Sequence, residues 1–256
     1  MQTDKVVRVM PTGPLPKYVA ISPDSRQAVV THWGDNTLGV LDISADHPRD
    51  FRYSGHWVVE RKLPTEGIKG NRDSNCGFCL RGTVYTPDGQ TVLVARMGGG
   101  GVAGFEAATG RYLGTVTDIV PNPRHVVISH DGRTLYVSGN QSGLVGRYDL
   151  AAVVQALKKA DAQRVAGPGG RSLSVGMGVR TIELSPDQRS LYAAINNDAR
   201  LVKVDLASWS VVARSEVDPF TVGLAVSPDG KTIVTTSQGR EMVGGYSVGF
   251  YRDSGR

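Results

Sequence analysis

The stretch RHVVISHDGRTLYVSGNQSGLVGRYDL, residues 124–150, decides the fold of this chain. It reads as a short apolar strand, a turn containing Asp131 and Gly132, a second strand, a polar loop and a third strand. The same order of elements recurs at other places in the sequence. A strand-rich unit that repeats along a chain decides the architecture, because each unit buries its apolar surface against its neighbours.

Five segments share this form. They are KYVAISPDSRQAVVTHWGDNTLGVLDI from Lys17, RGTVYTPDGQTVLVARMGGGGVAGFEAATG from Arg81, the segment from Arg124, RTIELSPDQRSLYAAINNDARLVKVDL from Arg180, and VGLAVSPDGKTIVTTSQGREMVGGYSV from Val222. The Ser or Thr that opens each turn lies at 22, 86, 129, 185 and 227, so the successive spacings are 64, 43, 56 and 42. A unit of about 42 residues is the size of a four-stranded propeller blade. The sequence therefore predicts an all-β fold, a β-propeller, as a single domain over residues 1–256.

Composition fits a globular chain with a substantial core. The chain has 256 residues, of which 40% are hydrophobic and 21% are charged. No apolar stretch is long enough to span a bilayer, and the start MQTDKVVR lacks the apolar centre of a signal peptide. The sequence thus predicts no membrane span and no leader within these residues, and export stays open.

The combination of SPDG, a strand such as TLYVSGN and the ending VGRYDL resembles the YVTN-type β-propeller repeat that occurs in many bacterial proteins. The resemblance covers nearly the whole chain, and it implies the propeller fold. It also implies an exported or periplasmic location, and it leaves function open, because such propellers serve as binding modules, enzymes and surface proteins. Members of the family often have seven blades, whereas five repeats are visible here.

Ring closure is predicted from the fourth strands. Candidates follow the first four repeats: WVVERKLP, YLGTVTDI, RSLSVGM and VVARSEV. Only GFYRDSGR follows the fifth, while KVVRVMPTGPLPKYVAIS at the start has the same form as VVARSEVDPFTVGLAVS. We therefore expect five four-stranded blades, with the N-terminal strand completing the last blade, since a propeller must pair its edges. The alternative is that these repeats are part of a larger ring.

Two insertions interrupt the repeat. Residues 46–80 hold the fourth strand of the first blade and a long charged loop into the second, and loops of this length are often functional. Residues 151–164, AAVVQALKKADAQR, have apolar positions at helical spacing and predict one inserted helix.

Cations occupy equivalent positions in four of the five repeats. Lys17, Arg81, Arg124 and Arg180 each stand at the start of an innermost strand, and Val222 is the apolar exception. Because innermost strands line the central channel, we expect these side chains to gather at one opening, the channel mouth. The loops between second and third strands are expected to rim the same mouth with His32, Trp33, Arg96, Asn140, Asn196 and Arg240.

Like charges held close together repel, and a bound anion relieves that repulsion. An Arg side chain can form two hydrogen bonds to a carboxylate or phosphate. The Trp33 ring could pack against such a ligand as an aromatic wall, and the Asn side chains could donate and accept hydrogen bonds. The favoured prediction is a binding module that holds a small anionic ligand or an acidic segment of a partner protein. The structural alternative is that the Arg residues pair with internal carboxylates such as Asp35, Asp73, Glu183, Asp198 or Asp218.

Two other functions stay open. One is an enzyme of lactonase or lyase type, in which His32 or His125 acts as the general acid or base beside an Arg. Lactonase-like propellers often carry acidic metal ligands in the channel, whereas the aligned positions here are basic. The other is an interaction scaffold with no small ligand. No Ser-His-Asp spacing, HExxH or nucleotide loop occurs, so no cofactor is predicted.

Both cysteines lie in SNCGFCLRG, residues 74–82. Haem attachment needs His after the second Cys, and Leu80 stands there. A Cys76–Cys79 disulfide is expected in an exported protein and two thiols in a cytosolic one. A metal site that joins Cys76 and Cys79 with His32 or His125 is the minority alternative.

Nucleic acid is not favoured as a partner. The formal net charge is +5, but the basic residues are spread over all repeats and aromatic residues make up 7%. The sequence predicts no oligomeric state.

Overall fold

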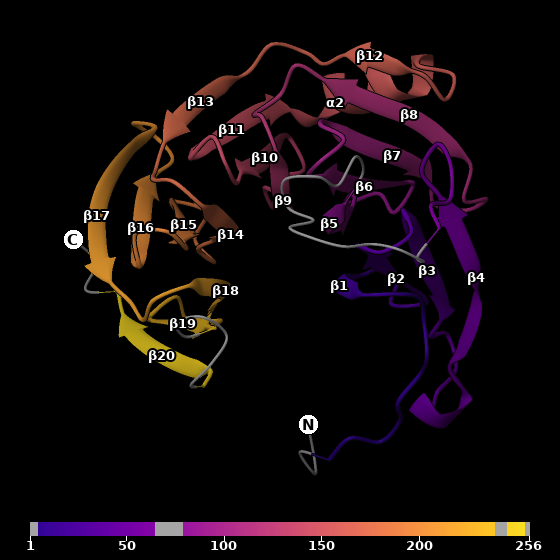
Figure 1. The fold of residues 1–256 in the computed structure, drawn as a ribbon, viewed down its shortest axis with the longest axis horizontal. Helices are drawn as coiled ribbons and strands as arrows, with labels where there is room; N and C mark the ends of the chain where they lie inside the picture. Colours follow the sequence, from indigo (N-terminus) through magenta and orange to yellow (C-terminus); the bar gives the residue numbers. More distant parts are fainter. Residues whose placement is uncertain (1–4, 65–78, 239–244, 254–256) are drawn as a thin grey trace.

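The computed structural model describes residues 5–64, 79–238 and 245–253, which form five β-sheets. The sheets are arranged as the blades of a β-propeller around one axis (Figure 1). The all-β propeller prediction is therefore confirmed. Each blade begins with its innermost strand, and the chain then moves outward strand by strand.

Blade 1 contains β1 (Pro16–Ile21), β2 (Gln27–His32), β3 (Thr37–Asp42) and β4 (Arg52–Val58), with the short helix η1 (Pro48–Asp50) before β4. Blade 2 contains β5 (Leu80–Tyr85), β6 (Thr91–Arg96), β7 (Val102–Glu106), β8 (Tyr112–Thr117) and β12 (Arg164–Ala166). Blade 3 contains β9 (Pro123–Ile128), β10 (Thr134–Gly139), β11 (Leu144–Asp149) and β13 (Arg171–Ser174). Blade 4 contains β14 (Val179–Leu184), β15 (Ser190–Ile195), β16 (Arg200–Asp205) and β17 (Ser210–Glu216). Blade 5 contains β18 (Thr221–Val226), β19 (Thr232–Ser237) and β20 (Ser247–Arg252).

The turn between the first two strands of every blade is built in the same way. The Ser or Thr hydroxyl donates to the Asp two residues later at 2.5–2.6 Å, and it accepts the amide of the residue five positions on at 2.9–3.0 Å. The Asp also accepts a backbone amide, and the hydroxyl is the main reason that the pKa of each Asp lies below its usual range. This Ser/Thr-x-Asp turn explains why the repeat could be read from the sequence.

The core lies between blades. Leu38 and Val40 of blade 1 pack with Leu80 of blade 2, and comparable clusters join each blade to the next. Innermost strands contact one another in the order β1, β5, β9, β14, β18. Burial of apolar faces between sheets is the main stabilising term in this architecture.

A bulge occurs near the start of every innermost strand. At this point β1, β5, β9, β14 and β18 each carry one residue more than the paired strand. In blades 1 and 3 a hydroxyl on the second strand bridges the bulge to the next blade. Ser138 Oγ accepts the His125 amide at 3.0 Å and donates to the Arg180 carbonyl at 2.7 Å. Thr31 makes the same pair of bonds to Tyr18 and Arg81, at 3.2 and 2.7 Å.

The prediction of ring closure is wrong in its detail. The described residues of blade 5 form three strands, and residues 5–12 form no strand, so residues 5–12 do not complete the last blade. Val6, Val7 and Val9 in this segment are 65–83% exposed. The physical reason is visible in Figure 1, where blades 1 and 5 stand at opposite ends of an open arc. A segment tied to β1 does not lie along the edge of β20.

The inserted segments also differ from expectation. Strand β4 begins at Arg52, earlier than the predicted WVVERKLP. The helix α2 spans Leu150–Lys159, capped by Asp149, and the residues after it form β12, which pairs parallel with β8 as a fifth strand of blade 2. Of the predicted 46–80 insertion, residues 65–78 lie outside the described residues. No helix in the described part of the chain is long and apolar enough to cross a membrane.

Ser138→Ala tests the bridge between blades 3 and 4. The substitution leaves a buried carbonyl and a buried amide without their partner, so we expect the free energy of unfolding to fall by about 1–3 kcal/mol. Urea unfolding measures this change. Ser208→Ala, in an exposed turn, serves as the control, and an equal loss in both variants would contradict the role assigned to Ser138.

Candidate functional site

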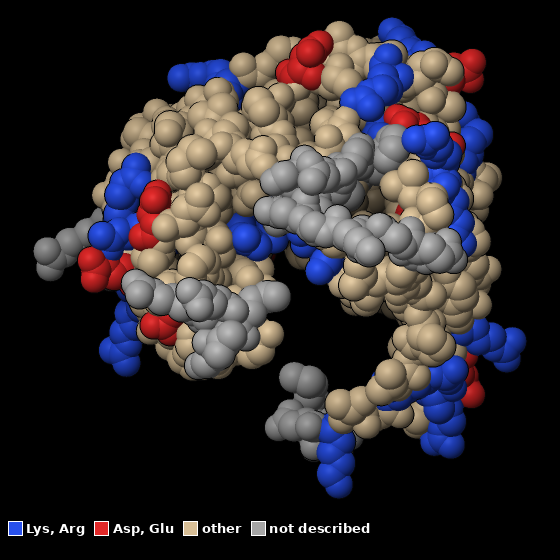
Figure 2. Space-filling view, in the orientation of Figure 1, with Lys and Arg blue, Asp and Glu red and all other residues tan. Residues whose placement is uncertain are grey.

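The four predicted cations stand at the bulges. Lys17 is the extra residue of β1 and Arg124 that of β9, while Arg81 and Arg180 lie within the bulges of β5 and β14. A bulge redirects the side chain of the extra residue, so rotation-related bulges direct these cations toward one region. Figure 2 shows Lys and Arg side chains along the inner edge of the arc. The four cations therefore lie at equivalent positions along the inner strands, near the start of each strand.

The chain turns sharply before it enters these strands. In four blades the residue two positions before the cation, or before Val222, has a left-handed backbone. These residues are Leu15 (φ 55°), Asn122 (φ 54°), Gly178 (φ 77°) and Phe220 (φ 58°). Leu and Phe rarely adopt this region, so the turn is held by its surroundings at a cost in backbone strain.

Trp33 connects two of the cations. Lys17 Nζ lies 5.4 Å and Arg81 Cζ lies 5.2 Å from the Trp33 ring centroid, and both are in the range of cation–π contacts. The ring therefore holds a cation from blade 1 and a cation from blade 2 near each other. This role differs from the aromatic wall for a ligand that the sequence suggested.

The loops after the second strands reach the next blade. Met97 occupies the position equivalent to Trp33, and its sulfur accepts a hydrogen bond from Arg124 Nη1 at 3.4 Å. Asn196 Nδ2 donates to the Thr221 carbonyl at 2.9 Å, and the Asn140 carbonyl accepts the Gly178 amide at 2.9 Å. Asn140 and Asn196 are buried, so they support the entry of the next inner strand. Met97 was missed because a thioether carries no charge signal in the sequence.

Arg96 lies elsewhere than expected. Its side chain is fully buried, and Nη1 donates to Glu60 at 2.7 Å and to Thr115 at 2.6 Å. Arg96 therefore joins blade 2 to the end of blade 1 and does not rim the mouth. Arg240 lies outside the described residues.

His125 and Tyr18 meet below the cations. Their ring centroids are 4.7 Å apart in an edge-to-face arrangement, although they come from blades 3 and 1. The intervening position in blade 2 is Gly82, where an added Cβ would come within 2.8 Å of His125 Cα. Gly82 is therefore required for this contact, and the two rings form the floor of the mouth.

Burial fixes the protonation of both rings. Burial, and then the charge of Arg124, lowers the pKa of His125 to about 4. The Ile182 amide donates to His125 Nδ1 at 3.5 Å, so the proton of the neutral ring belongs on Nε2, which has no hydrogen-bond partner among the described residues. Burial and the nearby Glu183 raise the pKa of Tyr18 to about 12. At neutral pH the floor thus presents uncharged rings.

Among the inner strands that the structure describes, β14 alone carries an acidic residue, and this residue is Glu183. It lies on β14, close enough to Tyr18 for its charge to raise the pKa of that phenol, and burial raises the pKa of Glu183 itself. A carboxyl with a raised pKa below a group of cations is a candidate for proton transfer. The sequence named Glu183 only as a possible ion-pair partner.

His32 lies away from the mouth. It is fully buried, and a Cβ at Gly13 or Gly39 would come within 2.4 or 2.9 Å of its ring. Its Nδ1 is 2.8 Å from Thr37 Oγ1, which donates to Asp35 at 2.7 Å. Burial lowers the pKa of His32. These contacts fit a histidine that orders blade 1 and the segment covering it.

The cysteine prediction falls partly outside the described residues. Cys79 is buried and disulfide-bonded, and no described cysteine is free. Cys76 lies outside the described residues, so the pairing of the two stays a prediction. The alternative metal site needs thiolates and does not fit a Cys79 in a disulfide. Within the described ranges no three His, Cys, Asp or Glu side chains cluster to hold a metal.

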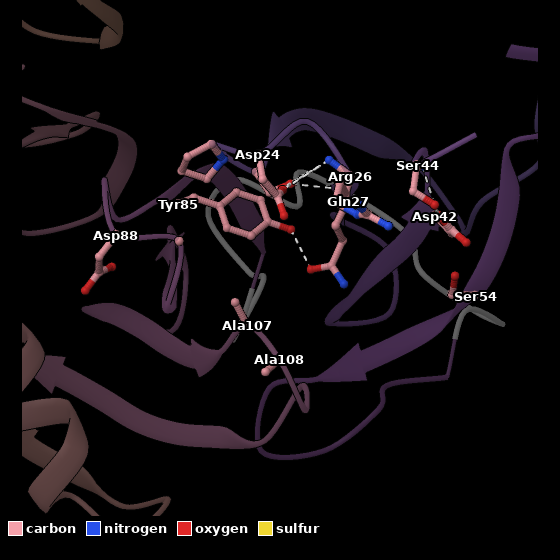
Figure 3. A pocket seen from close by; sticks show the side chains of 13 residues that line it. Asp24, Arg26, Gln27, Asp42, Ser44, Ser54, Tyr85, Asp88, Ala107 and Ala108 are labelled. Atoms are coloured by element: carbon pink, nitrogen blue, oxygen red, sulfur yellow. Dashed lines mark hydrogen bonds between the residues drawn. The ribbon is translucent and has the colours of Figure 1, made fainter. Parts of the chain in front are cut away.

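A separate pocket of about 500 Å³ lies at the opposite end of the strands, between blades 1 and 2 (Figure 3). Several of its polar groups already bind one another. Asp24 accepts from Ser22 and the Arg26 amide, and Tyr85 Oη donates to Gln27 at 2.8 Å. This pocket is lined by residues of the repeated turns. Its lining does not include a group of cations like the one at the bulges.

The order of the inner strands defines a β-propeller, and four of these strands carry a Lys or Arg at the bulge. The chain belongs to the family described as lactonase, 7-bladed β-propeller, whose model matches residues 2–249. The family has seven blades by that description, and the described residues form five sheets. No curated protein matches the chain.

Two solved structures share the fold. Hydrazine synthase of Kuenenia stuttgartiensis aligns with a TM-score of 0.63 and 20% identity over 92% of this chain. This chain spans 58% of the length of that one. A functionally unknown protein from Desulfotomaculum acetoxidans aligns with a TM-score of 0.68 and 14% identity, over 100% of this chain and 71% of the other. Identities this low support the fold alone.

The buried His125 predicts a pH dependence of stability. Its pKa is about 4 in the folded chain and about 6.5 in an unfolded chain, so the unfolded state binds more protons between these values. The free energy of unfolding should fall by up to about 3 kcal/mol as the pH drops through this window.

His125→Phe should remove most of this slope, and the smaller slope from His32 should remain. Urea unfolding at several pH values measures it. His130→Gln, at an exposed turn, is the matched control. An unchanged slope in His125→Phe would contradict the assignment.

Proposed function

We propose that the channel mouth binds a small anion carrying carboxylate or phosphate groups. The observation that carries the proposal is the placement of Lys17, Arg81, Arg124 and Arg180 at equivalent bulges of adjacent inner strands. Cations directed to one region repel, and an anion held by several guanidinium groups lowers that energy. An acidic segment of a partner protein offers the same chemistry.

The surroundings support this proposal. Trp33 keeps Lys17 and Arg81 near its ring, and Met97 contacts Arg124, so the cations are positioned before a ligand arrives. Preorganised donors bind an anion at a lower cost in side-chain entropy. The uncharged rings of Tyr18 and His125 below add no further positive charge, so the anionic group would be held at the mouth.

Isothermal titration with inorganic phosphate and with succinate tests this function. Arg124→Ala and Arg180→Ala should each weaken the binding of the anion that the wild type binds by about 10- to 100-fold, because each removes a charge-assisted hydrogen bond. Arg189→Ala, an exposed arginine at the opposite end of blade 4, is the control and should bind as the wild type does. Unchanged affinity in both mouth variants would exclude the site.

An enzyme of lactonase or lyase type is the second candidate. Membership of the lactonase family and the raised pKa of Glu183 favour it. In a lactone hydrolysis, Glu183 would take a proton from the water that attacks the carbonyl carbon, while Arg124 and Arg180 stabilise the oxyanion. As the oxyanion collapses, the ring C–O bond would break and Glu183 would return the proton to the leaving oxygen. His125 would act as a hydrogen-bond donor through Nε2, because that nitrogen carries the proton of the neutral ring.

Glu183→Gln separates the two candidates. If the chain hydrolyses a carboxylate-bearing lactone, the variant should lose at least about 100-fold in rate and keep its anion affinity, since the glutamine cannot accept the proton. The pH-stat method measures the rate. Loss of anion binding in this variant would show that Glu183 supports the mouth instead.

A further inference from the structure

The residue two positions before each cation, or before Val222, anchors the entry of its inner strand, and we call it the entry residue of the blade. In every blade its carbonyl accepts the amide of the residue that follows the second strand, at 2.9–3.2 Å. The five entry residues are Leu15, Cys79, Asn122, Gly178 and Phe220. This bond ties the start of the inner strand to the loop that reaches the next blade.

Blade 2 differs from the other blades in the chemistry of its entry residue. Cys79 is buried and disulfide-bonded. The other four entry residues are not cysteines, so a covalent restraint is possible in blade 2 alone. The second cysteine of the sequence, Cys76, lies outside the described residues. A disulfide removes conformations from the chain that it closes, so the bond of Cys79 restrains the entry of β5.

Cys79 is connected to two of the four cations. Arg81 follows it by two residues and lies 5.2 Å from the Trp33 ring centroid. The Cys79 carbonyl accepts the Met97 amide at 3.0 Å, and the Met97 sulfur accepts Arg124 Nη1 at 3.4 Å. A restraint on Cys79 therefore acts on the cation of blade 2 along the chain, and on the cation of blade 3 through Met97.

The contacts of Met97 transmit a displacement to blade 3. Its carbonyl accepts Asn122 Nδ2 at 2.9 Å, so Met97 also holds the entry residue of the next blade. Cys79, Met97 and Arg124 are all buried. Because buried side chains are closely packed, a movement of Cys79 shifts Met97 and, with it, Asn122 and Arg124.

We infer that the disulfide of Cys79 controls the anion affinity of the mouth, and that the oxidised chain binds the anion more tightly than the reduced chain. This inference rests on the function proposed above. With the disulfide formed, Arg81 and Arg124 are held in place before the anion arrives. After reduction, binding must also order the entry of β5, and this ordering lowers the affinity.

The redox step is the exchange of a disulfide with a dithiol. The two thiols of the reductant lose two electrons and two protons and close into a cyclic disulfide. The S–S bond of Cys79 gains these electrons and protons and becomes two thiols. The chain loses no atoms, so an oxidised dithiol restores the bond by the reverse exchange.

Isothermal titration with inorganic phosphate and with succinate, before and after treatment with dithiothreitol, tests the inference. Dithiothreitol is uncharged, so it does not compete for a cationic site. The affinity for the anion that the oxidised chain binds should fall at least about 5-fold on reduction and return on reoxidation. Circular dichroism checks that the reduced chain keeps its fold.

Cys76→Ser is the control variant. It removes the other cysteine and leaves the buried Cys79 side chain in place. The variant should bind the anion as the reduced wild type does, and dithiothreitol should not change its affinity. A response of this variant to dithiothreitol would overturn the inference.

A second measurement needs no anion. NMR of the chain labelled at its methionine methyl groups should show a shift of the Met97 resonance on reduction, and Met97→Leu assigns that resonance. Met177, an exposed residue before β14, should not shift. Equal affinity in the two redox states, or an unmoved Met97 resonance, would overturn the inference and leave the anion site intact. No binding of either anion by the oxidised chain would overturn the proposed function, and this inference with it.

Discussion

The innermost strands depend on one constraint: each must accommodate an extra residue while it packs against a neighbouring blade. The backbone groups released by the bulge need partners in a buried place. In blades 1 and 3 a hydroxyl on the second strand supplies them and reaches the carbonyl of the next blade. Blade packing and the direction of the cations therefore share one cause. The same bulge that joins the blades turns Lys or Arg toward the mouth.

The two ends of the strands carry different charged groups. The Ser/Thr-x-Asp turns place an aspartate with a lowered pKa at one end of every blade. The cations stand at the other end. Below the cations the rings of Tyr18 and His125 are uncharged at neutral pH, so the basic region ends at these two rings.

The place of each residue within its blade was predictable from the sequence. The contacts between side chains of different blades were not. The turns and the inner strands follow from local hydrogen bonds, so the alignment of Lys17, Arg81, Arg124 and Arg180 predicted their equivalent heights correctly. Arg96 was misplaced because the end of its strand faces Glu60 of the preceding blade, which no alignment shows. The meeting of Tyr18 with His125 depends on the missing side chain of Gly82 between them. Strand β12 depends on tertiary packing that the repeat does not encode.

The most direct test of the account is a crystal structure of the chain grown with a small dicarboxylate. The account predicts density for the anion within hydrogen-bonding distance of the guanidinium groups of Arg81, Arg124 and Arg180, above the rings of Tyr18 and His125. Guanidinium groups that each bind an Asp or Glu of the chain and point away from one another, with no anion between them, would contradict it.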